Sequence, residues 1–497
     1  MSPLHAWFKS KRHDAPNQSQ QVRPAVIKAR YDAAQTTREN MRHWVMADSC
    51  SADQSASPEV RRKLRERARY EVANNSYAKG IVLTIANDCI GTGPRLQVLT
   101  EDDQTNRKIE NAFSDWSQSV NLAEKLRTMR MAKTTDGEVF AVLAANPKLD
   151  SPVQMDVQLI ETERVASPQD QFNINANDVD GIQLNRLGIP ESYTVLRNHS
   201  APGAPGSFGS NIRRGFDVIT ADSMIHWFRM DRPDQHRGVP EITPALPLFA
   251  QLRRYTLAVI AAAETAADFA AVLYTDAPAN GEAQALEPMD VIDLEKRMAT
   301  VLPDGWRLGQ VSAQQPTTTY AEFKREILNE IARCLNLPYN IAACNSSGYN
   351  YASGRLDHQT YYKSIRVEQA DLVTSVLDPI LHGWIHEGML TTELNVLRRL
   401  KHLPHQWFFD GTEHVDPAKE ANAQATRLKS CSTTLAAEYA RQGKDWEIEL
   451  RQRAKEKNLM RELGLTESDG STETGHKESM QEQNDDPSAS ENKDASH

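Results

Sequence analysis

The sequence has few of the features that carry chemistry in enzymes and metal proteins. Its 497 residues include five cysteines, an odd and scattered number, and no pair has the Cys-x-x-Cys spacing. A disulfide framework or a thiolate metal site is therefore not expected, and reduced thiols are typical of a cytosolic compartment. The chain has no Gly-x-x-x-x-Gly-Lys-Ser/Thr segment, no Gly-x-Ser-x-Gly elbow and no Gly-x-Gly-x-x-Gly after a strand. These absences exclude a P-loop ATPase and favour a binding or structural role over catalysis.

Two histidines offer a weak alternative. His382 and His386 are four residues apart on a predicted helix, which is the spacing of zinc hydrolases. Where those enzymes carry a general-base glutamate, this chain has Gly383. We interpret both as ordinary helix histidines, and expect no catalytic residue, no metal and no cofactor.

Long apolar runs are also missing. The most apolar segment, Tyr255 to Tyr274, is interrupted by Glu264 and Asp268, so a membrane span is not expected. The N-terminal apolar stretch is too short for a secretory signal. Hydrophobic residues still make up 39% of the chain, which is enough to form buried cores.

There is no excess of positive charge. The 57 lysines and arginines against 67 acids give a net charge of −10, which excludes a basic coat for nucleic acid. Residues 466–497 hold nine of the acids and two lysines, a net charge of −7. This stretch has no aromatic residue and almost no aliphatic ones. Because it cannot bury enough apolar surface to offset its ordering entropy, we expect a disordered acidic tail.

Basic residues gather near the N-terminus. Residues 1–30 are expected to form a flexible basic arm. Glu59 to Tyr70 predicts a helix with six cationic residues, Arg61, Arg62, Lys63, Arg65, Arg67 and Arg69. We favour a solvated helix face paired with Glu59, Glu66 and Glu71; the alternative is a phosphate-contacting surface.

The rest of the chain predicts an α+β fold with long helices. Helices at 77–90, 107–116 and 124–133 and short strands at 138–143, 153–160, 181–184, 192–196 and 223–228 form a mixed body, with an exposed loop at 198–215. An alanine-rich helix over 243–271, a small α/β unit over 272–320 with a helix at 288–298, and a helix over 322–335 follow. A Gly/Ser/Asn/Tyr loop at 340–354 precedes helices over 355–386, 417–431 and 433–460.

Several segments, in the same order, resemble the phage portal protein of the lambda type. They are Asn75-Ser-Tyr-Ala-Lys-Gly with Asn87-Asp-Cys-Ile-Gly-Thr-Gly-Pro-Arg, Asp136-Gly-Glu-Val-Phe, Phe228-Arg-Met-Asp-Arg-Pro-Asp-Gln-His-Arg-Gly-Val-Pro, Tyr349-Asn-Tyr-Ala-Ser-Gly-Arg, and Val415-Asp-Pro-Ala-Lys-Glu with Gly443-Lys-Asp-Trp-Glu. One departure is Ser430-Cys431, where that family usually has a glycine.

The resemblance implies a portal-type subunit with an α+β wing, long stem helices, a small α/β clip and a C-terminal helical crown. On this chain the parts are the arm at 1–30, the wing at 31–240, a stem helix at 241–271, the clip at 272–320, a second stem helix at 321–338, a tunnel loop at 339–354, a long helix returning to the wing at 355–410, the crown at 411–465 and the tail at 466–497.

The resemblance also implies a function. Identical subunits, usually twelve, would form a ring at one vertex of a virion capsid assembled in the host cytoplasm. Double-stranded DNA would pass through the ring without sequence-specific contacts during packaging and ejection. The partners would be the terminase large subunit, the major capsid or scaffold protein and a head–tail connector. Two alternatives stay open: another ring-forming head–tail connector without terminase docking, and an enzyme whose site is not visible in the sequence.

The residue types favour particular contacts. Phosphate contacts without fixed charge suit a conduit, because each neutralised phosphate adds affinity and would slow sliding. The candidate DNA-facing residues of the tunnel loop are Asn345, Ser346, Ser347, Tyr349, Asn350, Tyr351 and Arg355. For Arg355, pairing with Asp357 or a neighbouring subunit is favoured over a phosphate. The candidates for the stem lumen or a subunit contact are Ala262, Glu264, Ala266 and Asp268.

Overall fold

The computed structural model describes residues 38, 41–167, 177–197, 215–268, 272–275, 306–309, 317–399, 403–411 and 417–465. The expected arm at 1–30, the helix at 288–298, most of the loop at 198–215 and the tail at 466–497 lie outside these ranges. The chain divides into two compact units, Met1–Ser55 and Ala56–His497. Within the described part of the first unit, helix α1 spans Ala52–Ser55.

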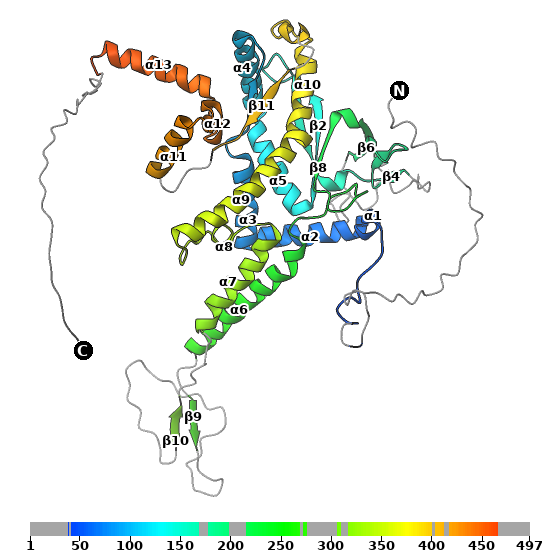
Figure 1. Ribbon diagram of the computed structural model, residues 1–497. Coiled ribbons are helices and arrows are strands. Elements are labelled where there is room, and N and C mark those ends of the chain that lie inside the picture. Colours follow the sequence, from blue (N-terminus) through cyan, green and yellow to red (C-terminus); the bar gives the residue numbers. More distant parts are fainter. Residues whose placement is uncertain are drawn as a thin grey trace, which may run out of the picture. The chain divides into compact units, whose positions relative to one another are not determined.

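The second unit contains both helices and strands (Figure 1). Its described α-helices are α2 Pro58–Asn74, α3 Ser76–Ile90, α4 Asp103–Ser119, α5 Leu122–Asp136, α6 Leu246–Asp268, α7 Thr317–Cys334, α8 Tyr339–Ala342, α9 Tyr351–Leu372, α10 Asp378–Gly388, α11 Pro417–Lys429, α12 Leu435–Arg441 and α13 Trp446–Glu462. Its strands are β1 Arg95–Val98, β2 Glu138–Ala145, β3 Met155–Ile160, β4 Asp178–Val179, β5 Ile182–Leu184, β6 Pro190–Leu196, β7 Phe216–Thr220, β8 Met224–Phe228, β9 Val272–Thr275, β10 Trp306–Gly309 and β11 His405–Phe408.

The strands form small antiparallel sheets. They are ordered β3-β2-β8, β4-β5-β6-β7, β1-β11 and β9-β10. In the first, Phe140 of β2 lies opposite Ile160 of β3 and His226 of β8. The β1-β11 pair joins residues more than three hundred positions apart, with Leu96 opposite Trp407. The expected mixed α+β fold is confirmed.

The described part of the chain has four clusters of buried side chains, of which the three larger ones hold these elements together. The largest packs α4, α5 and α10 against the β3-β2-β8 sheet around Trp116, Trp227 and Trp384, none of which is exposed. A second joins α3, α6, α7, α8 and α9. A third lies between β2, β3 and β8 and the four-stranded sheet, around Phe140 and Ile182. Leu372, the last residue of α9, is buried in the first cluster. The C-terminal end of α9 therefore belongs to the same packed body as the three-stranded sheet.

The basic helix α2 differs from both expectations for it. Ser57 caps its N-terminus and Pro58 is its first residue, a combination typical of helix starts. Arg61 and Arg65, however, are buried against acids of distant segments, Asp180 and Glu163. The prediction of a solvated or phosphate-contacting face is thus wrong for Arg61 and Arg65, which form interior ion pairs. Arg62, Lys63 and Arg67 are exposed, as expected.

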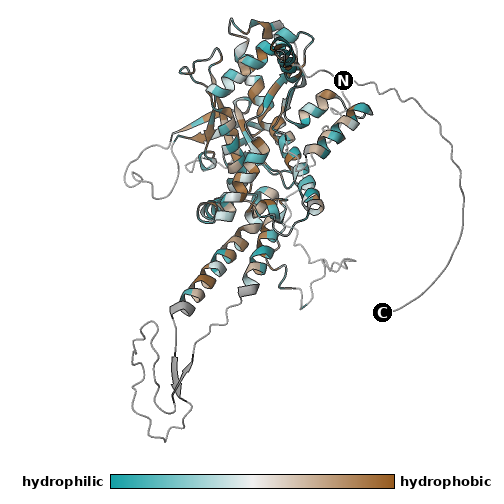
Figure 2. Ribbon diagram, turned by 90° about the vertical axis from the view of Figure 1, so that its left-hand side faces the viewer, coloured by the Kyte–Doolittle hydropathy of each residue, from teal (hydrophilic) through white to brown (hydrophobic). Residues whose placement is uncertain are grey.

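Helices α6 and α7 lie side by side and extend from the body (Figures 1 and 2). Tyr255 of α6 contacts Tyr320 and Phe323 of α7, with ring centroids 5.7 and 4.6 Å apart. Hydrophobic side chains continue on the outer surface of the pair, including Leu257 and Ile260, which are 60% and 49% exposed. The expected helix over 243–271 begins instead with a 3₁₀ turn, Thr243–Ala245, and α6 follows from Leu246. Pro247 has no amide hydrogen to bond the Thr243 carbonyl, which a regular α-helix from Thr243 would need.

Two predicted helices are interrupted. The helix expected over 355–386 begins at Tyr351 and contains a π turn, Val373–Leu377, just before Pro379. Since proline cannot donate to the preceding turn, a widened turn before it is physically reasonable. The helix expected over 433–460 is two helices, α12 and α13. Gly443 separates them in a left-handed conformation with φ of 69°, which glycine adopts most readily.

Candidate nucleic-acid interface

The predicted tunnel loop is shorter than the sequence indicates. Tyr339–Ala342 form helix α8, and α9 starts at Tyr351, so the loop proper is residues 343–350. Cys344 and Gly348 have positive φ angles of 50° and 87°. The Asn345 amide donates to the carbonyl of Asn340 at 3.0 Å, which ties the loop to α8. Apart from Gly348 and its two chain neighbours, no described atom lies within 4 Å of the position that a Cβ of Gly348 would take, so there is open space at this point of the loop.

The candidate loop residues occupy different settings. Asn345, Ser346 and Ser347 are exposed. Tyr349 is half-buried, and burial raises the pKa of its hydroxyl. A neutral hydroxyl remains a hydrogen-bond donor at ordinary pH. Four residues thus present uncharged polar groups at the loop.

Two other candidates belong to the helix start. The side chain of Asn350 accepts a hydrogen bond from the Ser353 amide at 2.8 Å, and the Ser353 hydroxyl accepts one from the Asn350 amide at 3.3 Å. This reciprocal cap fixes the first turn of α9. Tyr351 is the first residue of α9, not a loop residue, and Arg355 is exposed one turn further along. The sequence placed Asn350 among the DNA-facing residues of the loop. In the structure its side chain caps α9 instead, which is a structural role.

The stem candidates lie on a separate element. Ala262 and Glu264 are exposed on α6. Ala266 and Asp268 belong to the same helix, and their side chains are outside the described part. The structure does not bring these four together with the loop residues. It places the loop between α8 and α9, while the four lie near the far end of α6 (Figure 1).

A buried ionic cluster, missed by sequence reasoning, anchors α9. Lys133 of α5 is 1% exposed and donates to Glu368 and Asp371 of α9 at 2.6 and 3.0 Å. The Trp227 indole also donates to Asp371 at 2.7 Å. Burial alone would raise the pKa of Asp371, but Lys133 and Trp227 hold it below its usual value. The interaction fixes the C-terminal half of α9, the helix that follows the loop.

The same cluster reaches the start of the stem. Arg130 of α5 donates to Glu241 at 2.9 Å, and its guanidinium also lies 3.3 Å from Glu368. Glu241 precedes the 3₁₀ turn into α6 and is 3% exposed. Burial favours the neutral acid, but Arg130 and Lys133 keep the pKa of Glu241 below its usual value. One cationic pair on α5 thus holds both the stem entry and α9.

A second ionic cluster lies inside the α+β body. Both carboxylate oxygens of Glu138 accept from the guanidinium of Arg237, with distances of 2.7 to 3.0 Å. Glu138 also accepts from the Gly238 amide at 2.9 Å and lies 3.0 Å from the His226 ring. Although burial opposes ionisation, Arg237 and His226 hold the pKa of Glu138 well below its usual value. A Cβ on Gly137 would lie 2.3 Å from the Val239 carbonyl carbon, so the two segments meet at backbone contact.

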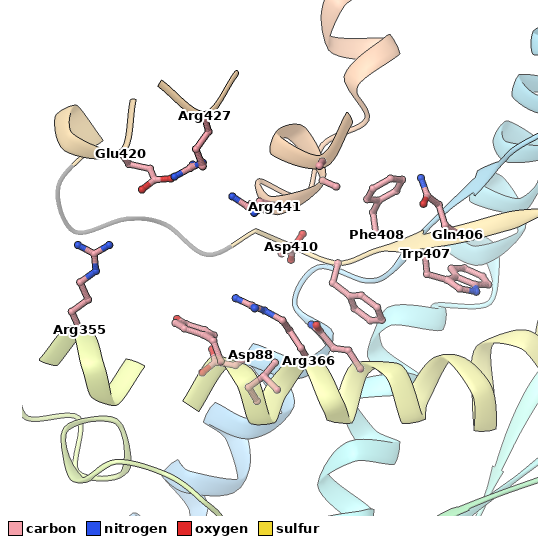
Figure 3. A pocket seen from close by; sticks show the side chains of 16 residues that line it. Asp88, Arg355, Arg366, Gln406, Trp407, Phe408, Asp410, Glu420, Arg427 and Arg441 are labelled. Carbon is pink, nitrogen blue, oxygen red and sulfur yellow. The ribbon is translucent and has the colours of Figure 1, made fainter. Parts of the chain in front are cut away.

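A groove adjoins α9. It has a volume of about 790 Å³ and lies between α9 on one side and β11, α11 and α12 on the other (Figure 3). Four arginines line it, Arg355, Arg366, Arg427 and Arg441, together with the aromatic side chains Tyr362, Trp407, Phe408 and Phe409. Sequence reasoning found only Arg355 among these, because the walls come from segments far apart in the chain.

A comparison of the whole sequence agrees with the motif pattern. The model of the family described as "Phage portal protein, lambda family" matches residues 37–369, about two thirds of the chain. This chain belongs to that family. The resemblance inferred from the motifs is therefore confirmed.

The individual proteins that resemble this chain have low sequence identity to it. The probable portal protein of Halomonas phage phiHAP-1 is 24% identical, over 97% of this chain and 98% of that protein. The neck of a native gene transfer agent particle, computed with C12 symmetry, contains a chain with 15% identity and a TM-score of 0.45, over 76% of this chain and 90% of that one. An HK97 family phage portal protein from Corynebacterium diphtheriae has 14% identity and a TM-score of 0.28, over 70% and 96%.

In this portal chain, two of the motifs that carried the resemblance meet in space. Glu138 belongs to Asp136-Gly-Glu-Val-Phe, and Arg237 belongs to the polar segment that begins at Phe228. Their ion pair joins β2 to the segment that leads into the stem. The sequence contains a hint of this contact, because each motif has a charged residue next to a glycine: Gly137-Glu138 in one and Arg237-Gly238 in the other.

Other kinds of site are not found in the described part of the portal chain. No three His, Cys, Asp or Glu side chains there are grouped to hold a metal ion. Among the same residues, no helix is both long and apolar enough to cross a membrane.

Proposed function

We propose that this chain is the subunit of a portal ring, usually of twelve copies, at one capsid vertex of a virion. Double-stranded DNA passes through the ring during packaging and ejection. The observation that carries the proposal is the match of the lambda portal family over residues 37–369. The chain acts as a conduit and docking platform, not as an enzyme.

The loop supports this role physically. Residues 343–350 project uncharged polar groups from between two helices that are packed into the body. Hydrogen bonds from such groups to phosphates carry no base information. They also release no counterions, so they do not hold the DNA in place as lysines or arginines would. A loop of this composition suits a duplex that must slide.

The parts of a portal subunit map onto the elements as follows. The arm is 1–30, the wing 31–240, the stem 241–271 and 321–338, the clip 272–320, the long helix and return to the wing 355–410, the crown 411–465 and the tail 466–497. The tunnel loop, expected at 339–354, is reduced by α8 and the start of α9 to 343–350. The β9-β10 pair is the described part of the clip.

The partners follow from the proposed position. The terminase large subunit docks on the ring during packaging, and a head–tail connector takes its place afterwards. The major capsid protein or a scaffold protein surrounds the ring as the particle forms in the host cytoplasm. No membrane takes part.

Deleting Ser346 to Tyr349 tests the tunnel role. The deletion removes the exposed loop and keeps the Asn350–Ser353 cap, so α9 is retained. We expect capsids to assemble but to package or retain less DNA, measured by quantifying nuclease-protected DNA per particle. Normal packaging at the normal rate would mean that the loop is a passive turn.

A further inference from the structure

The groove beside α9 presents two cations that have no ion-pair partner in the described part of the chain. Arg355 and Arg366 are exposed, and neither has an ion pair or hydrogen bond with any residue that the structure describes. They are 11 residues apart on one helix, about 16 Å along its axis. Figure 3 shows both side chains rising from α9 toward α11 and α12. Exposed arginines on one side of a lined groove form a row of anion-binding groups.

The carboxylates of the groove are already engaged. Asp88 accepts from the Tyr361 hydroxyl at 2.7 Å, and Asp410 accepts from the Thr92 hydroxyl at 2.8 Å. Glu420 accepts from Arg427 at 2.7 Å. Asp88 and Asp410 keep their negative charge in these bonds, because a hydroxyl is a neutral donor. Neither these two acids nor Glu420 has an ion pair with Arg355 or Arg366 among the described contacts.

The opposite wall adds a third available donor. Arg441 of α12 is 60% exposed and uses one guanidinium nitrogen to bind Glu438 at 3.1 Å. Its side chain points into the groove (Figure 3). Glu438 is mainly held by Arg427, which reaches it through two nitrogens. An anionic segment in the groove would therefore meet arginines from both walls.

The chain itself contains a segment of matching charge. Residues 466–497 follow directly after Leu465, beyond the end of α13, and carry nine acids and two lysines. A chain of 32 residues has a typical end-to-end distance of roughly 30 Å, and α13 is about 25 Å long. The tail is therefore long enough to return to the groove beside α12.

The spacing of the acids also fits. Glu473 and Glu478 are five residues apart, as are Asp486 and Glu491. Five residues of extended chain span about 16 Å, which is the axial separation of Arg355 and Arg366. An extended acidic strand lying along α9 would therefore place one carboxylate beside each of these two arginines.

We infer that the acidic tail, residues 466–497, docks in the arginine groove formed by Arg355, Arg366 and Arg441. The docked tail covers cations that would otherwise attract DNA phosphates. It thereby keeps this surface of the subunit from holding nucleic acid. This role is independent of the proposed ring and can be tested on the purified chain in any oligomeric state.

Zero-length carbodiimide coupling on an Arg366→Lys variant of the full chain tests the contact. The substitution keeps the positive charge and supplies an amine that couples only to a carboxylate in direct contact. We expect mass spectrometry to find residue 366 joined to an acid between Glu467 and Asp494. The Lys444–Glu449 pair, at 3.5 Å, is the internal positive control. Coupling of residue 366 only to acids outside the tail, or no coupling while the control pair reacts, would overturn the inference.

A binding measurement separates the tail from nucleic acid as the occupant. A fluorescent peptide of residues 466–497 is titrated into the chain truncated after Leu465, with anisotropy as the readout. We expect Arg355→Glu with Arg366→Glu to weaken binding at least tenfold. The control, Arg62→Glu with Arg67→Glu on the exposed face of α2, should change it less than twofold. If the groove variant lost affinity for a short oligonucleotide but not for the peptide, nucleic acid would be the occupant and the inference would be wrong.

Discussion

Glu138 shows how much of the body depends on one side chain. It has no exposed surface, and it joins β2 through Arg237 to the segment before the stem and through His226 to β8. A carboxylate buried at this depth is tolerated because several donors surround it. The negative charge of Glu138 is therefore needed to balance the buried positive charge of Arg237.

Replacing Glu138 with glutamine leaves Arg237 buried, with Asp180 as its remaining ion-pair partner among the described residues. We expect the free energy of unfolding to fall by about 3–5 kcal/mol, the usual cost of breaking a buried ion pair on one side. Urea denaturation followed by circular dichroism measures it. The control is Glu66→Gln, whose exposed pair with Lys63 should matter little. Equal urea midpoints for the two variants would contradict the assigned role of Glu138.

His226 makes stability depend on pH. Burial lowers its pKa below that of an unfolded histidine, about 6.5, despite the neighbouring Glu138. The unfolded chain therefore binds the proton first as pH falls, so the stabilising contribution is complete above about pH 6.5 and is lost below it. We expect a His226→Asn variant to lose less stability than the parent between pH 7 and pH 5. Identical slopes of stability against pH would show that His226 does not titrate in this range.

At the scale of elements, local signals predicted well and distant partners did not. The stop at Gly91 is where the sequence placed it, because a glycine with positive φ is a local requirement of the helix end. The burial of Arg61 and Arg65 was missed because their acids lie on other elements, far along the chain. The start of α9 was also missed, although Asn350 and Ser353 form a readable cap. Glycine is unfavourable inside helices, so Gly354 led to the prediction that residues 351–354 belong to the loop, although they form the first turn of α9.

The Asn350 cap gives a prediction for α9. Asn350→Ala should cost roughly 1 kcal/mol locally, since the Ser353 amide loses its acceptor. Hydrogen exchange should speed up several-fold at residues 351–354 and stay unchanged in α10. Ser346→Ala, which keeps the cap, is the matched control. Unchanged exchange in Asn350→Ala would mean that the first turn of α9 is held by other contacts.

At the scale of the whole molecule, the body was predictable and the groove was not. The groove gathers Asp88, Arg366 and Arg441 from three distant segments. Such a site needs the complete tertiary structure. The stem differs, because the exposed alanines of α6 could be recognised from their helical spacing alone.

Exposed small residues on α6 predict a contact between copies of the chain. Ala262→Trp should disturb ring closure if this face meets a neighbour, since closed rings require repeated contacts that fit. The number of copies per particle, measured by native mass spectrometry, should fall or become heterogeneous. Ala73→Trp, on the exposed face of α2, controls for the added bulk. An unchanged assembly in Ala262→Trp would place this face of α6 in solvent.

Electron microscopy of the purified full-length chain tests the central claim most directly. A portal subunit is predicted to form closed rings with a central hole wide enough for a DNA duplex, and class averages should show rotational symmetry. Particles that remain compact monomers over a wide range of protein and salt concentrations would contradict the account.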